Sequence, residues 1–140
     1  MRRIVPIAAL LASWLMVSAA QAADGKIGVE FNDLQPGDTG CRAVFVLHNG
    51  LDKPISALSL RVVGFDAKKH ATLFLALDVG ILPVDKTRVL RFDLGKGVQC
   101  SDVSRLVLDD VTSCEGAGLN PAACLGLISA SSLASVPFDF

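Results

Sequence analysis

The chain has 140 residues, of which 51% are hydrophobic and 6% aromatic, and its formal net charge is −1 at pH 7. A chain of this length is expected to form one small domain with a modest core. The weak acidic charge and the scarcity of aromatic side chains argue against nucleic-acid binding.

Residues 1–22 have the pattern of a secretory signal peptide. Arg2 and Arg3 precede an apolar run that is too short to span a bilayer, and small residues ending at Ala22 form an A-x-A cleavage pattern. We therefore expect cleavage after Ala22, which leaves residues 23–140 as a single periplasmic domain without a stable membrane span. The two arginines leave both the general secretory route and the twin-arginine route open.

Short segments that alternate apolar and polar side chains follow, which is typical of half-buried β-strands. In the segment at residues 88–94, we expect Leu90, Phe92 and Leu94 to lie on the face opposite Arg88 and Arg91. Turn-forming residues separate the segments, so the pattern predicts an all-β, antiparallel β-sandwich. The expected strands are residues 27–32, 42–48, 57–65, 73–77, 88–94 and 105–111.

A helical pattern fits only two short stretches, residues 101–107 and 121–129. After them, serines 129, 131, 132 and 135 suggest a flexible tail. The final residues, 136–140, alternate again and end in Phe140, so we expect a last strand that docks on the sandwich.

Four cysteines remain after the predicted cleavage, and an even number in an exported chain indicates two disulfides. None of the spacings forms a C-x-x-C motif, which makes a redox centre or a zinc site improbable. Three pairings are possible. If each strand reverses direction, the loop at residues 95–104 returns to the pole where strand 42–48 begins. The strand directions therefore predict the pairs Cys41–Cys100 and Cys114–Cys124.

Three sequence patterns resemble the immunoglobulin-like modules of the FxLYD type. They are HNGLDKPI at residues 48–55, GFD at 64–66 and TRVLRF at 87–92. The resemblance covers residues 27–114, and the whole chain is also similar to small exported proteins of Gram-negative bacteria. It implies an immunoglobulin-like β-sandwich and a periplasmic address. It carries over no functional residue, because these relatives have no assigned site.

Few residues are arranged for catalysis. His48 and His70 are the two histidines, and polar turn positions explain both better than a metal-binding or general-base role. Asp109 and Asp110 form a pair of carboxylates, but neighbours on a strand are expected to point to opposite faces. The sequence has no nucleophile elbow, phosphate-binding loop or dinucleotide motif. We therefore expect no enzyme activity, no cofactor and no metal site.

Two groups of residues form a candidate partner surface. Lys86, Arg88 and Arg91 place positive charge on and beside one strand, while Phe65 and Phe74 fall on the outer face of theirs. The sequence thus favours an interaction or structural module whose partner is a protein or a component of the cell envelope.

Two other functions remain open from the sequence. One is a small-ligand carrier or enzyme with a site at one pole of the sandwich, near His48, Asp52 and Lys53. The other is a secreted inhibitor that uses the loop between Cys114 and Cys124 as its contact. The sequence leaves the partner and the oligomeric state open.

Overall fold

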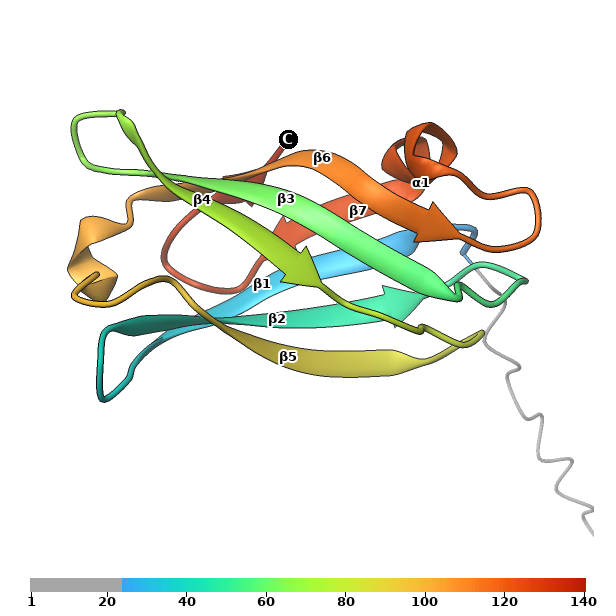
Figure 1. Cartoon of the computed structure of the whole chain (residues 1–140), viewed down its shortest axis with the longest axis horizontal. Coiled ribbons are helices and arrows are strands. Elements are labelled where there is room, and N and C mark those ends of the chain that lie inside the picture. The colour runs from blue at the N-terminus through green and yellow to red at the C-terminus, as the bar shows by residue number, and fades with distance from the viewer. Residues whose placement is uncertain (1–23) are drawn as a thin grey trace, which may run out of the picture.

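A computed structural model describes residues 24–140. The predicted signal peptide and the cleavage after Ala22 lie outside the described residues. The described chain folds into two sheets that stack on each other (Figure 1). Its strands are β1 (Ile27–Pro36), β2 (Cys41–Asn49), β3 (Ala57–Phe65), β4 (Ala71–Asp78), β5 (Thr87–Asp93), β6 (Arg105–Glu115), β7 (Ile128–Ser132) and β8 (Phe138–Asp139).

The two sheets contain four strands each. The first sheet has the order β5-β2-β1-β7 and the second has the order β4-β3-β6-β8. With β1, β2 and β5 in one sheet and β3 and β6 in the other, the strands follow the arrangement of strands A, B, E and C, F in immunoglobulin domains. The predicted all-β, immunoglobulin-like sandwich is therefore confirmed.

The expectation of purely antiparallel sheets is wrong for two strand pairs. β7 runs parallel to β1, and β8 runs parallel to β6. β6 ends at the pole where β1 begins, and a short helix, α1 (Pro121–Leu127), carries the chain across to the first sheet. Because β7 starts at that same pole, it must run in the same direction as β1. The chain then turns at the opposite pole, where β6 begins, so β8 runs parallel to β6.

The alternation of apolar residues explains the core. Ile27, Val29 and Phe31 of β1 are all buried, as expected for one inward-facing row. The ring centroids of Phe31 and Phe45 lie 5.3 Å apart, and Phe138 of β8 stacks edge-on against both, at 6.3 Å and 5.5 Å. The expected docking of the last strand is thus confirmed, and Phe138 completes the aromatic centre of the core.

The two helical expectations are only partly correct. Asn120 caps α1 by accepting a hydrogen bond from the N–H of Ala123 at 2.9 Å, and the helix ends at Leu127. Residues 128–132 are a strand rather than a flexible tail, because they pair with β1 along their whole length. The stretch 101–107 is not helical as a whole. It contributes to a single 3₁₀ turn, η1 (Cys100–Asp102), before β6 begins.

Both predicted disulfides are present, one at each pole. Cys41–Cys100 joins the start of β2 to η1, and Cys114–Cys124 joins the end of β6 to α1. The strand directions read from the sequence were therefore correct at both poles. No helix within residues 24–140 is long and apolar enough to cross a membrane.

Candidate functional site

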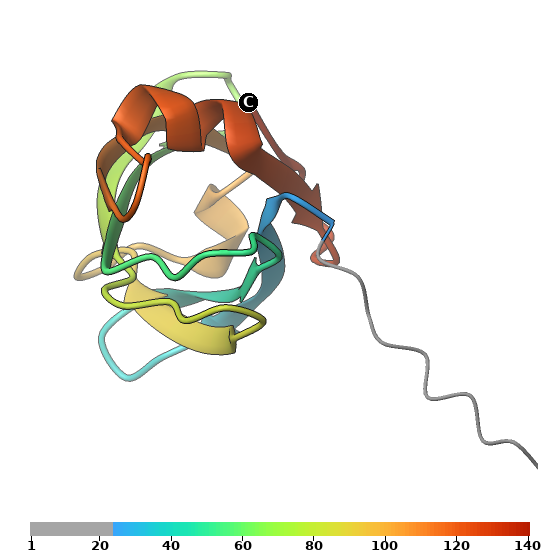
Figure 2. The same cartoon turned by 90° about the vertical axis from the view of Figure 1, so that its right-hand side faces the viewer.

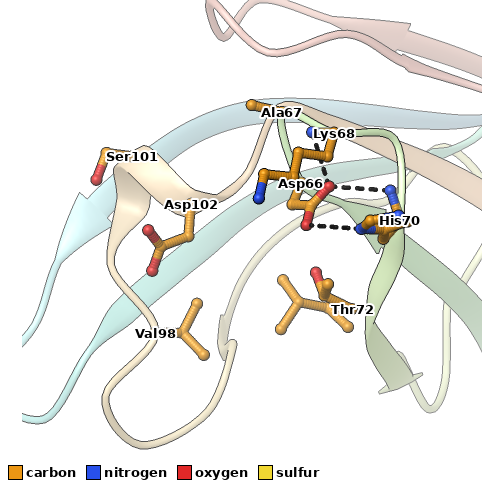
Figure 3. Close-up of a pocket in the computed structure, with 9 residues that line it drawn as sticks. Asp66, Ala67, Lys68, His70, Thr72, Val98, Ser101 and Asp102 are labelled. Carbon is orange, nitrogen blue, oxygen red and sulfur yellow. Dashed lines mark hydrogen bonds and ion pairs between the residues drawn. The ribbon is translucent and has the colours of Figure 1, made fainter.

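A cavity of about 580 Å³ lies at the pole of the Cys41–Cys100 disulfide. The loop between β3 and β4 forms one wall, and η1 forms the other (Figure 3). Its lining combines the acidic groups of Asp66 and Asp102 with Lys68, His70 and Ser101. The cavity therefore carries charges of both signs beside the apolar side chains of Leu73 and Val98.

The carboxylate of Asp66 organises the β3–β4 loop. Its Oδ1 accepts hydrogen bonds from the backbone N–H groups of Lys68 at 2.8 Å and His70 at 2.9 Å. The ring Nδ1 of His70 lies 3.6 Å from Oδ2 of the same carboxylate (Figure 3). The N–H of His70, with smaller contributions from that of Lys68 and from the His70 ring, lowers the pKa of Asp66 below its ordinary value. Asp66 therefore remains ionised and acts as the cap of a tight turn.

The second carboxylate also bonds to backbone. Asp102 accepts a hydrogen bond from the N–H of Gln99 at 2.9 Å, which closes η1. Both acids of the cavity thus hold loops in shape. Among the described residues, neither carboxylate forms a hydrogen bond with a nucleophilic side chain. Within residues 24–140, no cluster of three or more His, Cys, Asp or Glu side chains could hold a metal ion.

Sequence reasoning missed this cavity, although it identified one of its parts. Asp66 follows Phe65 at a strand end, a position that predicts a turn-forming role, and that is the role it has. The opposite wall comes from Ser101 and Asp102, more than 30 residues away in the chain. Only the sandwich brings the two loops together, so no local pattern could reveal their contact.

The pole suggested for a ligand site, near His48, Asp52 and Lys53, lies at the other end of β2. The Nδ1 of His48 lies 3.0 Å from the hydroxyl of Thr87, and its Nε2 lies 3.6 Å from Asp85. These contacts tie the imidazole across to β5 and the turn before it. Asp52 is exposed in the loop after β2.

Asn49 is the only fully buried polar side chain among the described residues. Its Nδ2 donates to the carbonyl groups of Lys53 at 3.0 Å and Leu82 at 2.9 Å, and its Oδ1 accepts from the N–H of Leu51 at 3.0 Å. Asn49 therefore supplies the hydrogen-bond partners that these backbone groups would otherwise lack. It joins the loop after β2 to the segment that precedes β5.

The residues of the candidate partner surface do not come together. Phe65 and Phe74 belong to the second sheet, while Arg88 and Arg91 lie on β5 of the first sheet, with Lys86 just before it. The charged and the aromatic residues therefore occupy different surfaces of the sandwich.

The expected position of Arg88 is also wrong. Arg88 lies on the same face of β5 as Leu90, because side chains two residues apart share a face. Its Nη1 donates to the carbonyl oxygens of Val79 and Ile81, both at 3.0 Å. The guanidinium thus fixes the connection between β4 and β5, and it is not a free basic contact.

The outer surface of the second sheet carries an apolar row. Phe74 of β4, Val63 of β3 and Val107 of β6 are cross-strand neighbours, and directly opposite residues share a face. The side chain of Phe74 is 72% exposed, and Val63 is buried without joining the core between the sheets. Beyond Val107, a cavity of about 520 Å³ is lined by Leu125 of α1 and by Phe140. We call Val63, Phe74, Val107, Leu125 and Phe140 the outer apolar face.

Ion pairs flank the outer apolar face on β3, β6 and β8. Arg61 contacts the carboxylates of both Asp109 and Asp110, and Arg105 pairs with Asp139 at 2.6 Å. The expectation that Asp109 and Asp110 point to opposite faces is wrong. A register shift in the β3–β6 pairing next to Arg61 breaks the alternation, so both carboxylates reach one guanidinium.

The loop between Cys114 and Cys124, considered for an inhibitor, turns its one large apolar residue inward. Leu119 packs against the core cluster. The inhibitor role stays a prediction. Comparisons of the chain with protein-family models, with curated proteins and with solved structures found no match.

Proposed function

We propose that the chain is an exported, non-catalytic interaction module that works in the periplasm and binds a protein of the cell envelope through the outer apolar face. The observation that carries this proposal is the composition of that face. Phe74 and Phe140 expose 72% and 57% of their surface, and Val107 and Leu125 line the same cavity as Phe140. Contiguous apolar surface of this kind is characteristic of binding sites on folded domains.

The charged surroundings of the face support the same proposal. Protein interfaces combine an apolar centre with a polar rim. The pairs of Arg61 with Asp109 and of Arg105 with Asp139 supply such a rim, and each is half exposed. A partner with an apolar centre and a few polar groups at its margin would therefore fit this surface.

Export is supported by the cysteines and by the N-terminal sequence. All four cysteines are paired, and disulfides of this kind persist in oxidising compartments such as the periplasm. Residues 1–22 have the signal pattern described above. Fractionation of cells that express the whole chain, with mass spectrometry of the mature N-terminus, tests this part. A protein that begins at Ala23 in the periplasmic fraction is expected.

The binding role is tested by capture from envelope extracts of the producing cells, with the purified oxidised chain as bait. We expect Phe140→Asp to abolish capture of the specific partner, because it places a charge in the outer apolar face. The matched control is Leu133→Asp, at a residue that is 72% exposed in the loop between β7 and β8. The proposal is refuted if both variants capture the same proteins as the unchanged chain.

A small-ligand carrier is the second candidate, and the cavity between Asp66 and Asp102 is the observation that favours it. The cavity lies at the pole opposite His48, so a carrier would use a different site from the one the sequence suggested. A thermal-shift screen of small polar metabolites tests this alternative. A ligand that raises the melting temperature of the unchanged chain, but not of Ser101→Trp, would support it.

A further inference from the structure

The second sheet ends in an open edge at β4, whose backbone groups the proposed function does not use, although the side chain of Phe74 belongs to the outer apolar face. β4 pairs with β3 on one side and has no strand on the other among residues 24–140 (Figures 1 and 2). We propose that β4 pairs edge to edge, in antiparallel orientation, with β4 of a second copy of this chain. The two second sheets would then form one continuous eight-stranded sheet.

The backbone of β4 identifies the groups that would form this pairing. The N–H of Val79 donates to the carbonyl of Leu58 at 2.9 Å, and Ser59 lies opposite Asp78. Hydrogen bonding alternates along an antiparallel ladder, so residues 73, 75 and 77 also turn their backbone groups toward β3. The N–H and C=O groups of Phe74 and Ala76 therefore point to the open edge.

β4 lacks the devices that usually protect an edge. Natural sheets guard their edges with charged side chains, prolines or very short strands. β5, the edge of the first sheet, carries Arg88 and Arg91, and β8 has only two residues. In contrast, residues 71–77 read ATLFLAL, with no charge and no proline. β4 is thus a long apolar edge that a soluble monomer would be expected to cover.

The sequence of β4 is complementary to itself, and this favours a second copy as the occupant. With Phe74 opposite Phe74 of the second copy, Leu73 meets Leu75 on the inner face and the two Phe74 rings meet on the outer face. Leu73 and Leu75 are only half buried in one copy, and the pairing would cover them.

The charges near the ends of β4 also favour the antiparallel orientation. In this register an antiparallel pair brings Asp78, at the end of one strand, opposite His70 of the other, next to Lys69. A parallel pair would place the two Asp78 carboxylates side by side, which is unfavourable. The antiparallel pairing also sets the two Phe74 rings next to each other, so it would extend the outer apolar face across both copies.

Sedimentation and hydrogen exchange of the oxidised chain test the proposal. A single strand pair is a small interface, so we expect a monomer–dimer equilibrium with a dissociation constant of about 10–100 µM. At concentrations well above it, the amides of Phe74 and Ala76 should gain protection, whereas the amide of Leu75 is protected at all concentrations. A face-to-face dimer would leave the amides of Phe74 and Ala76 unchanged.

Two variants locate the interface. Ala76→Pro removes an N–H that points to the open edge and should weaken the dimer about tenfold. Val89→Pro is the matched control, because the bond from Leu94 N–H to the carbonyl of Cys41 shows that Val89 turns its backbone to the open side of β5. Phe74→Lys, which opposes two positive charges across the dimer axis, should also abolish pairing.

The proposal is overturned if the chain stays monomeric up to about ten times the expected dissociation constant, or if the dimer is equally stable in Ala76→Pro and Val89→Pro. Phe140→Asp should leave dimerisation intact, since Phe140 does not belong to β4. The dimer and the proposed partner binding can therefore fail independently.

Discussion

The two disulfides should differ in their contribution to stability, because they close loops of different length. The half-cystines of Cys41–Cys100 are 59 residues apart, and those of Cys114–Cys124 are 10 apart. In the loop-entropy description, the longer bridge stabilises the fold by about 4.2 kcal/mol and the shorter one by about 2.7 kcal/mol. For a domain of this size, the loss of about 4 kcal/mol corresponds to a decrease in melting temperature of about 15 °C.

The comparison of two double variants separates the loop contribution from the packing contribution. Cys41, Cys114 and Cys124 are nearly inaccessible and Cys100 is partly buried, so Cys41→Ala/Cys100→Ala removes no more buried sulfur than Cys114→Ala/Cys124→Ala. The difference in unfolding free energy between the two variants should therefore be about 1.5 kcal/mol, with the first variant less stable.

Urea unfolding at neutral pH, followed by far-ultraviolet circular dichroism, measures both free energies. The variants must have the same m-value for the comparison to hold, because a change in m indicates a change in the denatured state. If Cys114→Ala/Cys124→Ala is the less stable variant, the bridges do not stabilise the fold mainly by constraining the unfolded chain. The reasoning from loop length is then refuted.

Three further perturbations follow from single side chains. Asn49→Ala leaves three backbone groups without their partner, two of them buried, and should lower the unfolding free energy by about 3 kcal/mol in urea titrations. The backbone N–H of His70 lowers the pKa of Asp66 in the folded protein, so the ionised carboxylate stabilises the fold above about pH 4. That contribution is lost as the pH falls through the lowered pKa, and Asp66→Asn should flatten the dependence of stability on pH below about 4. Gly40→Ala would place a Cβ 2.5 Å from a backbone oxygen and should destabilise by about 1–3 kcal/mol, whereas Gly126→Ala, with open space around it inside α1, should stabilise slightly in the same assay.

The strands were predictable because one periodic signal governs them. The inward rows that the sequence indicated in the central strands, such as Leu58, Leu60 and Val62 in β3, are buried in the sandwich, whereas those of the edge strands β4 and β5 are partly half buried. The disulfides followed from the same signal, since alternating strand directions decide which pole each cysteine reaches. These features depend on the order of the elements and on the pattern of burial, and both can be inferred from short stretches of sequence.

The errors occur where tertiary pairing overrides local pattern. The serines of β7 have no strong strand preference, but β1 offers an unpaired edge and Ile128 provides an inward anchor. Asp109 and Asp110 depart from strict alternation because the β3–β6 register shifts beside Arg61. The cavity between Asp66 and Asp102 depends on two loops that only the complete sandwich brings together.

The two sides of the sandwich are closed differently, and this asymmetry connects the fold to both proposals. On one side, the chain crosses from the second sheet to the first through α1 and returns to the second sheet between β7 and β8. The Cys114–Cys124 disulfide fastens α1 to β6 (Figure 2). On the other side, β4 and β5 are joined only by residues 79–86 at one end, where Arg88 donates to the carbonyl of Val79. The inward residues near this side, including Leu75 and Phe92, are therefore only half buried. A second copy paired along β4 would supply on that side the cover that α1 and the last strands supply on the other, while the outer apolar face would remain available to a different partner.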